Sequence, residues 1–256
     1  MNSVFFSYDG LKSSDLGVYL VKLDKGLVRD PFLGEREIIS ETIAGNETPY
    51  IYDVRTSSLR ISLTLSCLDG AWTLDKRREV ARWLDKRRFC EFYSTDNIEK
   101  LYYLQYVGGI DLYSNSANQG YITVEFLNIS PYTYSPFYVQ IFDYSTITTP
   151  TTFEFTNSGD NNLYPEIWVE KVGTGEISIV NLSNGGKDFK FTGLLDQEVI
   201  YVDNRPAFHH IESSLPNTYR HDNFSGEFLE LTRGVNRLQL TGKCILKFMH
   251  QFELKG

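Results

Sequence analysis

The stretch Leu59-Arg60-Ile61-Ser62-Leu63-Thr64-Leu65-Ser66-Cys67 decides the fold class, because every odd position is apolar and every even position is polar. Successive side chains of a β-strand point to opposite faces, so this alternation predicts a strand with one buried and one solvated face. The same period of two recurs at 122–126, 177–179, 189–191, 238–240 and 244–249. Turn sequences such as Asp69-Gly70 and Asn184-Gly185-Gly186 separate these segments. The sequence therefore predicts a mainly β protein built from hairpins and meanders.

One segment departs from this pattern and predicts a single α-helix. Thr73 can cap a helix that begins at Leu74. Val80, Trp83 and Leu84 then recur at spacings of three and four residues and form one apolar stripe. We expect this stripe to pack across a sheet.

The helical segment is also the basic part of an acidic chain. Residues 75–88 contain seven basic and three acidic residues, a net charge of +4, in a chain whose net charge is −8. Two interpretations stay open for its arginines, among them Arg77 and Arg78. They either belong to a solvated face with intrahelical ion pairs or form a cationic contact for an acidic partner subunit.

A change of composition divides the chain into two predicted domains. Pro131 and Pro136 interrupt the strand pattern, and a threonine-rich stretch follows at 146–152. We expect an N-terminal β domain with the helix at residues 1–133. The remainder, residues 134–256, has the short strands and turns of a β-sandwich or jelly roll.

Composition and missing motifs argue against several functional classes. With 25 basic and 33 acidic residues the chain is not expected to read DNA sequence. Phosphate-binding loops, the G-x-S-x-G motif and the H-E-x-x-H motif are absent from the sequence. Cys67, Cys90 and Cys244 are far apart, and we expect them to be buried reduced thiols. We therefore predict no cofactor, no metal site and no enzymatic activity.

The start of the chain and its hydropathy predict a location. The first residues lack a basic start followed by a long apolar run, and no run of 18 uncharged apolar residues occurs. We expect the protein to be made in a cytosol, without a signal peptide and without membrane insertion.

Segment 36–52 provides the candidate interface. Its isoleucines and tyrosines flank a bend at Gly45-Asn46 and could form a hairpin arm that reaches a neighbouring subunit. The alternative is that the hairpin folds back on its own domain. The candidate interface residues are Arg36, Ile38, Ile43, Tyr50 and Tyr52, together with Arg77 and Arg78 of the helix.

A series of short motifs, in a fixed order, covers nearly the whole chain. It includes 6–18 (FSYDGLKSSDLGV), 103–109 (YLQYVGG), 124–132 (VEFLNISPY), 164–167 (YPEI) and 231–238 (LTRGVNRL). In this order the motifs resemble the distal tail protein family of long-tailed, non-contractile bacteriophages, in the short form found in phages of Gram-positive hosts. One departure is Gly45-Asn46-Glu47, where the family often has a glycine pair separated by a basic and an acidic residue.

This resemblance implies a virion protein that acts as a structural hub of the tail tip. The N-terminal domain, with its helix and a β-hairpin extension, would form a homohexameric ring, and a galectin-like or jelly-roll C-terminal domain would project outward. The ring would join the major tail or tube protein to the tail-associated lysin, the fibre or other baseplate proteins. DNA would only pass through the central channel, and the protein would be made in the cytoplasm of the bacterial host.

Two functions of other classes stay open. A carbohydrate-binding adhesion module would recognise host cell-wall polysaccharide through Trp168 and exposed tyrosines. A glycosidase on a β scaffold would need two carboxyl groups about 5–10 Å apart. The candidate acids for the glycosidase are Glu154, Glu166, Glu170, Glu198, Asp203 and Glu212.

Overall fold

A computed structural model of the chain describes residues 4–21 and 32–256. The chain forms two compact units, one comprising Met1–Tyr134 with Lys255–Gly256 and the other Ser135–Leu254. Strands dominate both units, and one α-helix occurs among the described residues. The prediction of a mainly β, two-domain protein with a single helix is therefore confirmed.

The first unit is built on one large antiparallel sheet. Its central path runs in the order β2-β1-β7-β8-β10-β6-β3, and β9 pairs with β10. The alternating stretch forms β6, in which Ile61, Leu63 and Leu65 are buried. Strand β6 lies in register with β10, so that Leu63 is opposite Val124. The strands are β1 (Phe6–Tyr8), β2 (Leu11–Lys12), β3 (Val18–Leu20), β6 (Arg60–Cys67), β7 (Cys90–Ser94), β8 (Asn97–Val107), β9 (Leu112–Ser114), β10 (Gly120–Asn128) and β11 (Thr133–Tyr134).

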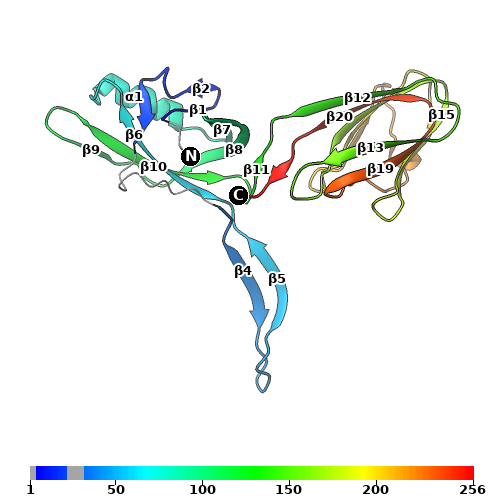
Figure 1. Ribbon diagram of the computed structural model, residues 1–256, viewed down its shortest axis with the longest axis horizontal. Helices are drawn as coiled ribbons and strands as arrows, with labels where there is room; N and C mark the ends of the chain where they lie inside the picture. Colours follow the sequence, from blue (N-terminus) through cyan, green and yellow to red (C-terminus); the bar gives the residue numbers. More distant parts are fainter. Residues whose placement is uncertain (1–3, 22–31) are drawn as a thin grey trace. The chain divides into compact units, whose positions relative to one another are not determined.

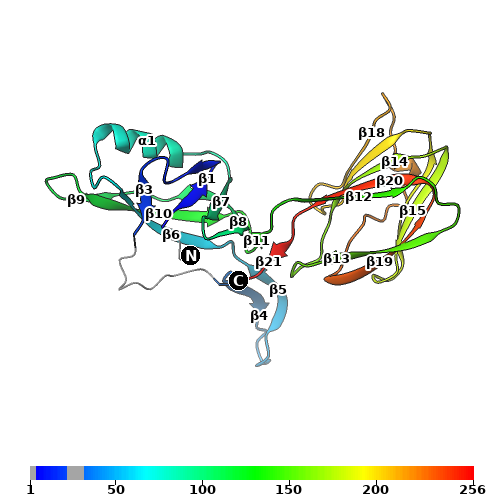
Figure 2. The ribbon, with the colours of Figure 1, turned by 45° about the horizontal axis from the view of Figure 1, so that its top comes forward.

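Helix α1 (Leu74–Leu84) covers one face of this sheet (Figure 2). The side chain of Thr73 accepts a hydrogen bond from the backbone N–H of Lys76 at 3.3 Å, as the capping prediction requires. Val80, Trp83 and Leu84 are buried. The Trp83 ring stacks on Phe6, with ring centroids 5.4 Å apart. The predicted cap and apolar stripe are confirmed.

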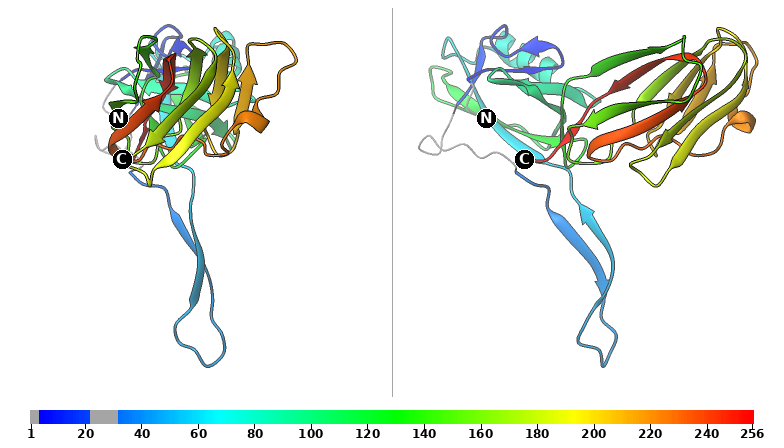
Figure 3. Two further views of the ribbon diagram at one scale, coloured as in Figure 1. Left: turned by 90° about the vertical axis from the view of Figure 1, so that its right-hand side faces the viewer. Right: turned by 45° about the vertical axis from the view of Figure 1, so that its right-hand side comes forward.

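The second unit is a sandwich of two antiparallel sheets (Figure 3). One sheet has the order β12-β20-β14-β17-β18 and the other β13-β19-β15-β16. Their inner faces share one apolar core, in which Phe155 of one sheet lies 5.6 Å from Phe248 of the other. The elements are β12 (Tyr138–Tyr144), β13 (Thr151–Asn157), β14 (Glu166–Lys171), β15 (Gly175–Asn181), β16 (Lys187–Leu194), β17 (Val199–Asp203), β18 (His210–Ser213), a 3-10 turn (His221–Asn223), β19 (Gly234–Thr241), β20 (Cys244–His250) and β21 (Glu253–Leu254).

The three cysteines lie in these two cores. All are buried and none forms a disulfide. Burial raises the pKa of Cys67 to about 11 and that of Cys244 to about 12, so both stay protonated at neutral pH. The predicted burial of the three thiols is confirmed.

His250 is a polar side chain in the apolar core of the second unit. Its side chain is almost completely buried, and neither ring nitrogen has a hydrogen-bond partner among the described residues. The ring lies among the rings of Tyr138, Phe155 and Phe252, at centroid distances of 5.8, 5.1 and 4.9 Å. Burial in these surroundings lowers the pKa of His250 from 6.5 to about 4.

The variant His250→Phe is expected to lose less stability in acid than the wild type. Between pH 6.5 and 4 the unfolded chain binds a proton on His250 that the folded chain does not bind. His250 therefore lowers the free energy of unfolding of the wild type by about 3 kcal/mol as the pH drops through this range. Above pH 6.5 it causes no such loss. Urea unfolding at neutral and acid pH measures the difference between the two proteins. The matched control is His221→Phe at an exposed position, and an equal acid loss in wild type and His250→Phe would contradict the assignment.

Candidate assembly interface

Strands β4 (Arg36–Glu41) and β5 (Tyr50–Thr56) form a two-stranded sheet of their own (Figure 1). The pairing is antiparallel, with a register shift between Ile39 and Ser40. Among the described residues neither strand pairs with any other strand. Isolated two-stranded hairpins are at best marginally stable in water, so a surface that covers the hairpin would stabilise it.

The two faces of this hairpin differ in chemistry. Ile38 lies directly opposite Val54, so these two side chains share one face, and they are 59% and 50% exposed. Glu37 lies opposite Arg55 and their side chains point to the other face. Near the tip, the Tyr52 hydroxyl donates a hydrogen bond to Glu41 at 3.0 Å. The hairpin therefore carries one face with uncovered apolar side chains, which also holds Arg36 and Thr56 at its base, and a second face with the charged pair of Glu37 and Arg55.

All five residues predicted for the interface on segment 36–52 lie on this hairpin and are exposed. They are Arg36, Ile38, Ile43, Tyr50 and Tyr52. Every residue of both strands is exposed except Ile39, which is half-buried. In the structure the hairpin therefore does not fold back on its own domain. Its contact with a neighbouring subunit stays a prediction.

The two predicted helix arginines have different surroundings. Arg77 Nε donates to the backbone carbonyl of Trp72 at 2.8 Å, and its guanidinium also donates to Asn118 Oδ1 at 3.1 Å. Arg77 thus holds the helix start against neighbouring loops. Arg78 is exposed and forms no ion pair within the described part of the chain. The structure does not bring either arginine into hydrogen-bonded or ionic contact with the described hairpin.

The intrahelical ion pairs of the first interpretation are mostly absent from α1. Among the described residues one such pair occurs, between Lys76 and Glu79 at 2.7 Å. Lys86 and Arg88 lie beyond the end of the helix and both form ion pairs with Asp9. These two basic side chains are therefore held by the turn between β1 and β2.

Edge strand β12 is a feature that the sequence reasoning missed. It pairs on one side only, with β20. Tyr138, Val139 and Ile141 are 42%, 52% and 66% exposed, and Phe137 just before the strand is also exposed. The sequence signal was available, since Phe137-Tyr138-Val139-Gln140-Ile141 holds four large apolar residues and no charge.

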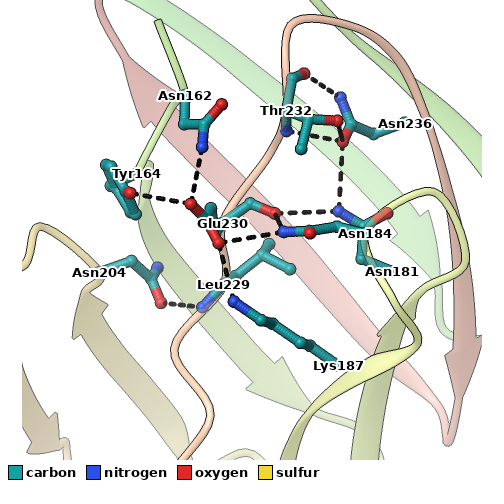
Figure 4. A network of polar contacts seen from close by, with 10 residues as sticks. All are labelled: Asn162, Tyr164, Asn181, Asn184, Lys187, Asn204, Leu229, Glu230, Thr232 and Asn236. Carbon is teal, nitrogen blue, oxygen red and sulfur yellow. Dashed lines mark hydrogen bonds and ion pairs between the residues drawn. The ribbon is translucent and has the colours of Figure 1, made fainter.

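Glu230 is the centre of a polar network in the second unit (Figure 4). Its carboxylate accepts hydrogen bonds from Asn162 at 2.7 Å, from the Tyr164 hydroxyl at 2.9 Å and from Asn184 at 3.1 Å. The Lys187 ammonium lies 2.9 Å away and is the main reason why the pKa of Glu230 falls to about 2. All partners belong to the same unit, so the network anchors the loop before β19 and leaves no carboxylate oxygen free for chemistry.

Three of the acids considered for a glycosidase also have structural partners. Glu198 is completely buried and pairs with Arg220 at 2.7 Å. Asp203 and Glu166 both pair with Arg205, at 2.6 and 3.3 Å. Burial alone would raise the pKa of Glu198 and of Asp203, but hydrogen bonds and the charges of Arg220 and Arg205 lower both overall, whereas a general acid needs a raised pKa.

Trp168, the residue named for the sugar-binding alternative, is packed between its sheet neighbours. The Lys247 ammonium lies 4.5 Å from the centroid of the indole, and the Tyr201 ring lies 4.9 Å away. No observation favours a stacking platform here, and sugar binding stays a prediction.

Among residues 4–21 and 32–256 there is no group of three or more His, Cys, Asp or Glu placed to hold a metal ion. The described helix is too short to cross a membrane.

An exposed hairpin with apolar side chains and an open edge strand with a single charge are typical of proteins that assemble with other proteins. Comparison with known families agrees with this class. Residues 1–130 match the family described as phage tail protein N-terminal domain, and residues 132–250 match the phage tail C-terminal domain. The chain therefore belongs to the family of phage tail proteins.

Relatives and solved structures show the same two-domain plan. The SPbeta prophage-derived protein YomH of Bacillus subtilis (strain 168) is 26% identical over 253 residues, which cover 98% of each chain. The crystal structure of the SPP1 Dit (gp 19.1) protein superposes with a TM-score of 0.71 at 16% identity, over 97% of this chain and 98% of that one. A chain of the phage P2 baseplate in its activated conformation gives a TM-score of 0.53 at 9% identity, over 97% of each chain.

The family models confirm that the chain is a phage tail protein, and the superposition on SPP1 Dit confirms the fold expected from the resemblance to distal tail proteins. The protein is a structural component of a phage tail, and thus of the virion. The galectin-like character of the second unit stays a prediction, because the structure establishes a two-sheet sandwich and no closer likeness.

Proposed function

We propose that this protein is the hub of a phage tail tip, assembled as a hexameric ring by its first unit, residues 1–133. The ring joins the end of the tail tube to the tail-associated lysin, fibre or baseplate proteins, and DNA crosses it only in transit. The second unit, residues 134–256, presents its sandwich to other tail proteins. The protein carries out no catalysis and needs no cofactor.

The observation that supports this proposal most is the uncovered apolar face of the β4–β5 hairpin. A monomer gains nothing from exposing Ile38, Ile51 and Val54 to water, and each would be worth about 1.5–3 kcal/mol if fully buried. A hairpin that binds a different surface on the next subunit makes a head-to-tail contact, and such contacts form a ring when the rotation from one subunit to the next closes. The solved SPP1 Dit structure, presented as a paradigm of the hub adsorption apparatus, has the same fold.

The hairpin variant Ile38→Asp is expected to abolish assembly and leave the subunit folded. The aspartate places a charge on the apolar face, while the folded cores do not depend on this exposed side chain. Light scattering measures the particle mass, and circular dichroism checks the fold. We expect Ile43→Asp near the hairpin tip to act in the same way.

The matched control is Leu74→Asp at the start of helix α1. Leu74 is 63% exposed, similar to Ile38, and an aspartate in the first turn of a helix is favourable. This control should keep the wild-type mass. A ring that persists in Ile38→Asp would contradict the role of the hairpin.

A further inference from the structure

We propose that the open edge of strand β12 pairs antiparallel with β12 of a second copy of this chain, about a two-fold axis at Gln140. The two five-stranded sheets then continue into each other. This contact differs from the head-to-tail contacts of a ring and does not rest on the proposed hub function.

The sandwich has four sheet edges, and three of them carry devices that prevent strand addition. Edge β13 has the exposed carboxylate of Glu154 at its centre, and the short edge β18 carries His210 and Glu212. Edge β16 is covered, because Phe191 bridges to Phe224 and Ser225 donates a backbone hydrogen bond to Lys190. Charged side chains and covering loops are the usual protection of natural sheet edges.

Edge β12 has no such device. In the seven residues of this strand the single charge is Asp143, whose side chain accepts a hydrogen bond from the backbone of Ser145. Val139 and Ile141 are more than half exposed. A largely apolar strand that has its single charge near one end and a paired strand on one side only is a template for another strand.

The sequence of β12 is complementary to itself, and this selects a second copy as the occupant. Antiparallel pairing centred on Gln140 places Val139 opposite Ile141 of the other copy, twice by symmetry. It also places Tyr138 opposite Phe142, and Gln140 opposite Gln140. Pairs of apolar β-branched or aromatic side chains stabilise adjacent strands, and no like charges face each other in this register.

Charge disfavours pairing of a second copy through the edge strands β13 and β18. Each copy has a net charge of −8, so two copies repel unless they meet where carboxylates are absent. Symmetric pairing of β13 through its centre would oppose Glu154 to Glu154, and pairing of β18 would bring its exposed Glu212 close to the other copy. Strand β12 avoids both conflicts.

A cysteine pair tests the register in the full-length chain. Directly opposed residues of antiparallel strands have Cα atoms about 4.5–5.5 Å apart, within the range that a disulfide spans. We expect Gln140→Cys to form a disulfide-linked dimer under mild oxidation, because the three native cysteines are buried. The control Asp143→Cys places the two thiols about 20 Å apart in this register and should not cross-link.

Particle mass tests the contact itself. We expect Ile141→Lys to halve the mass of the wild-type particle, and Thr152→Lys on edge β13 to leave it unchanged. The hairpin variant Ile38→Asp should lose the ring and keep the pair, whereas Ile141→Lys should lose the pair and keep the ring. Equal masses for wild type and Ile141→Lys, or cross-linking of Asp143→Cys as efficient as that of Gln140→Cys, would overturn the proposal.

Discussion

Replacing Trp83 with alanine is expected to destabilise the first unit by about 3–5 kcal/mol. Trp83 is 4% exposed and lies between the helix and the sheet. Its ring stacks on Phe6 and meets Tyr8 edge-on at 5.9 Å, and its Nε1 donates a hydrogen bond to the Tyr8 carbonyl at 2.9 Å. The substitution removes these ring contacts, leaves a cavity and leaves a buried carbonyl without its donor.

Chemical denaturation measures this loss when one signal reports on each unit, because the two units have separate cores. The transition of the first unit should move to lower denaturant, while that of the second unit stays in place. Leu74→Ala on the same helix is the control, since Leu74 is exposed and its replacement should change stability by less than about 0.5 kcal/mol. Similar losses for both variants would contradict the packing assigned to Trp83.

Replacing Arg220 with methionine is expected to cost the second unit about 3–5 kcal/mol, because it leaves a buried carboxylate unpaired. Glu198 accepts hydrogen bonds from the Arg220 guanidinium at 2.8 and 2.7 Å. Ser213 and the backbone of Leu195 donate to the same carboxylate at 2.7 and 2.9 Å. Desolvation alone would raise the pKa of Glu198, but these hydrogen bonds and the arginine charge lower it overall.

The double variant Glu198→Leu/Arg220→Met should recover much of this loss, since it removes both charges together. The exposed pair of Glu154 and Arg237, 3.8 Å apart, provides the control. Glu154→Gln should change stability by less than about 1 kcal/mol, because exposed ion pairs are screened by solvent. If Arg220→Met is no worse than Glu154→Gln, the buried pair does not stabilise the unit.

The strands and the helix could be predicted because their signals are local. Alternation over a few residues identifies β6, and the cap at Thr73 with the apolar residues Val80, Trp83 and Leu84 identifies α1. Each pattern depends on the geometry of one element and not on its partners. The helix ends at Leu84, and the basic residues Lys86 and Arg88 beyond its end bind Asp9, a pairing that the local sequence does not reveal.

The features that depend on pairing over long sequence distances could not be predicted. Glu230 and Asn162 are 68 residues apart in the network of the second unit. The open edge of β12 is defined by which strand does not pair with it, and a strand pattern alone does not give the order of strands in a sheet. For the hairpin, the sequence supplied its bend and its apolar residues, but its exposure followed only from the absence of a covering element among the described residues.

Electron microscopy of the full-length protein at high concentration tests the central claim most directly. The account predicts ring-shaped particles with six-fold symmetry and a central channel in the wild type, and folded subunits without rings in Ile38→Asp. A wild-type protein that stays strictly monomeric at high concentration, and also in the presence of the other tail proteins, would contradict the account.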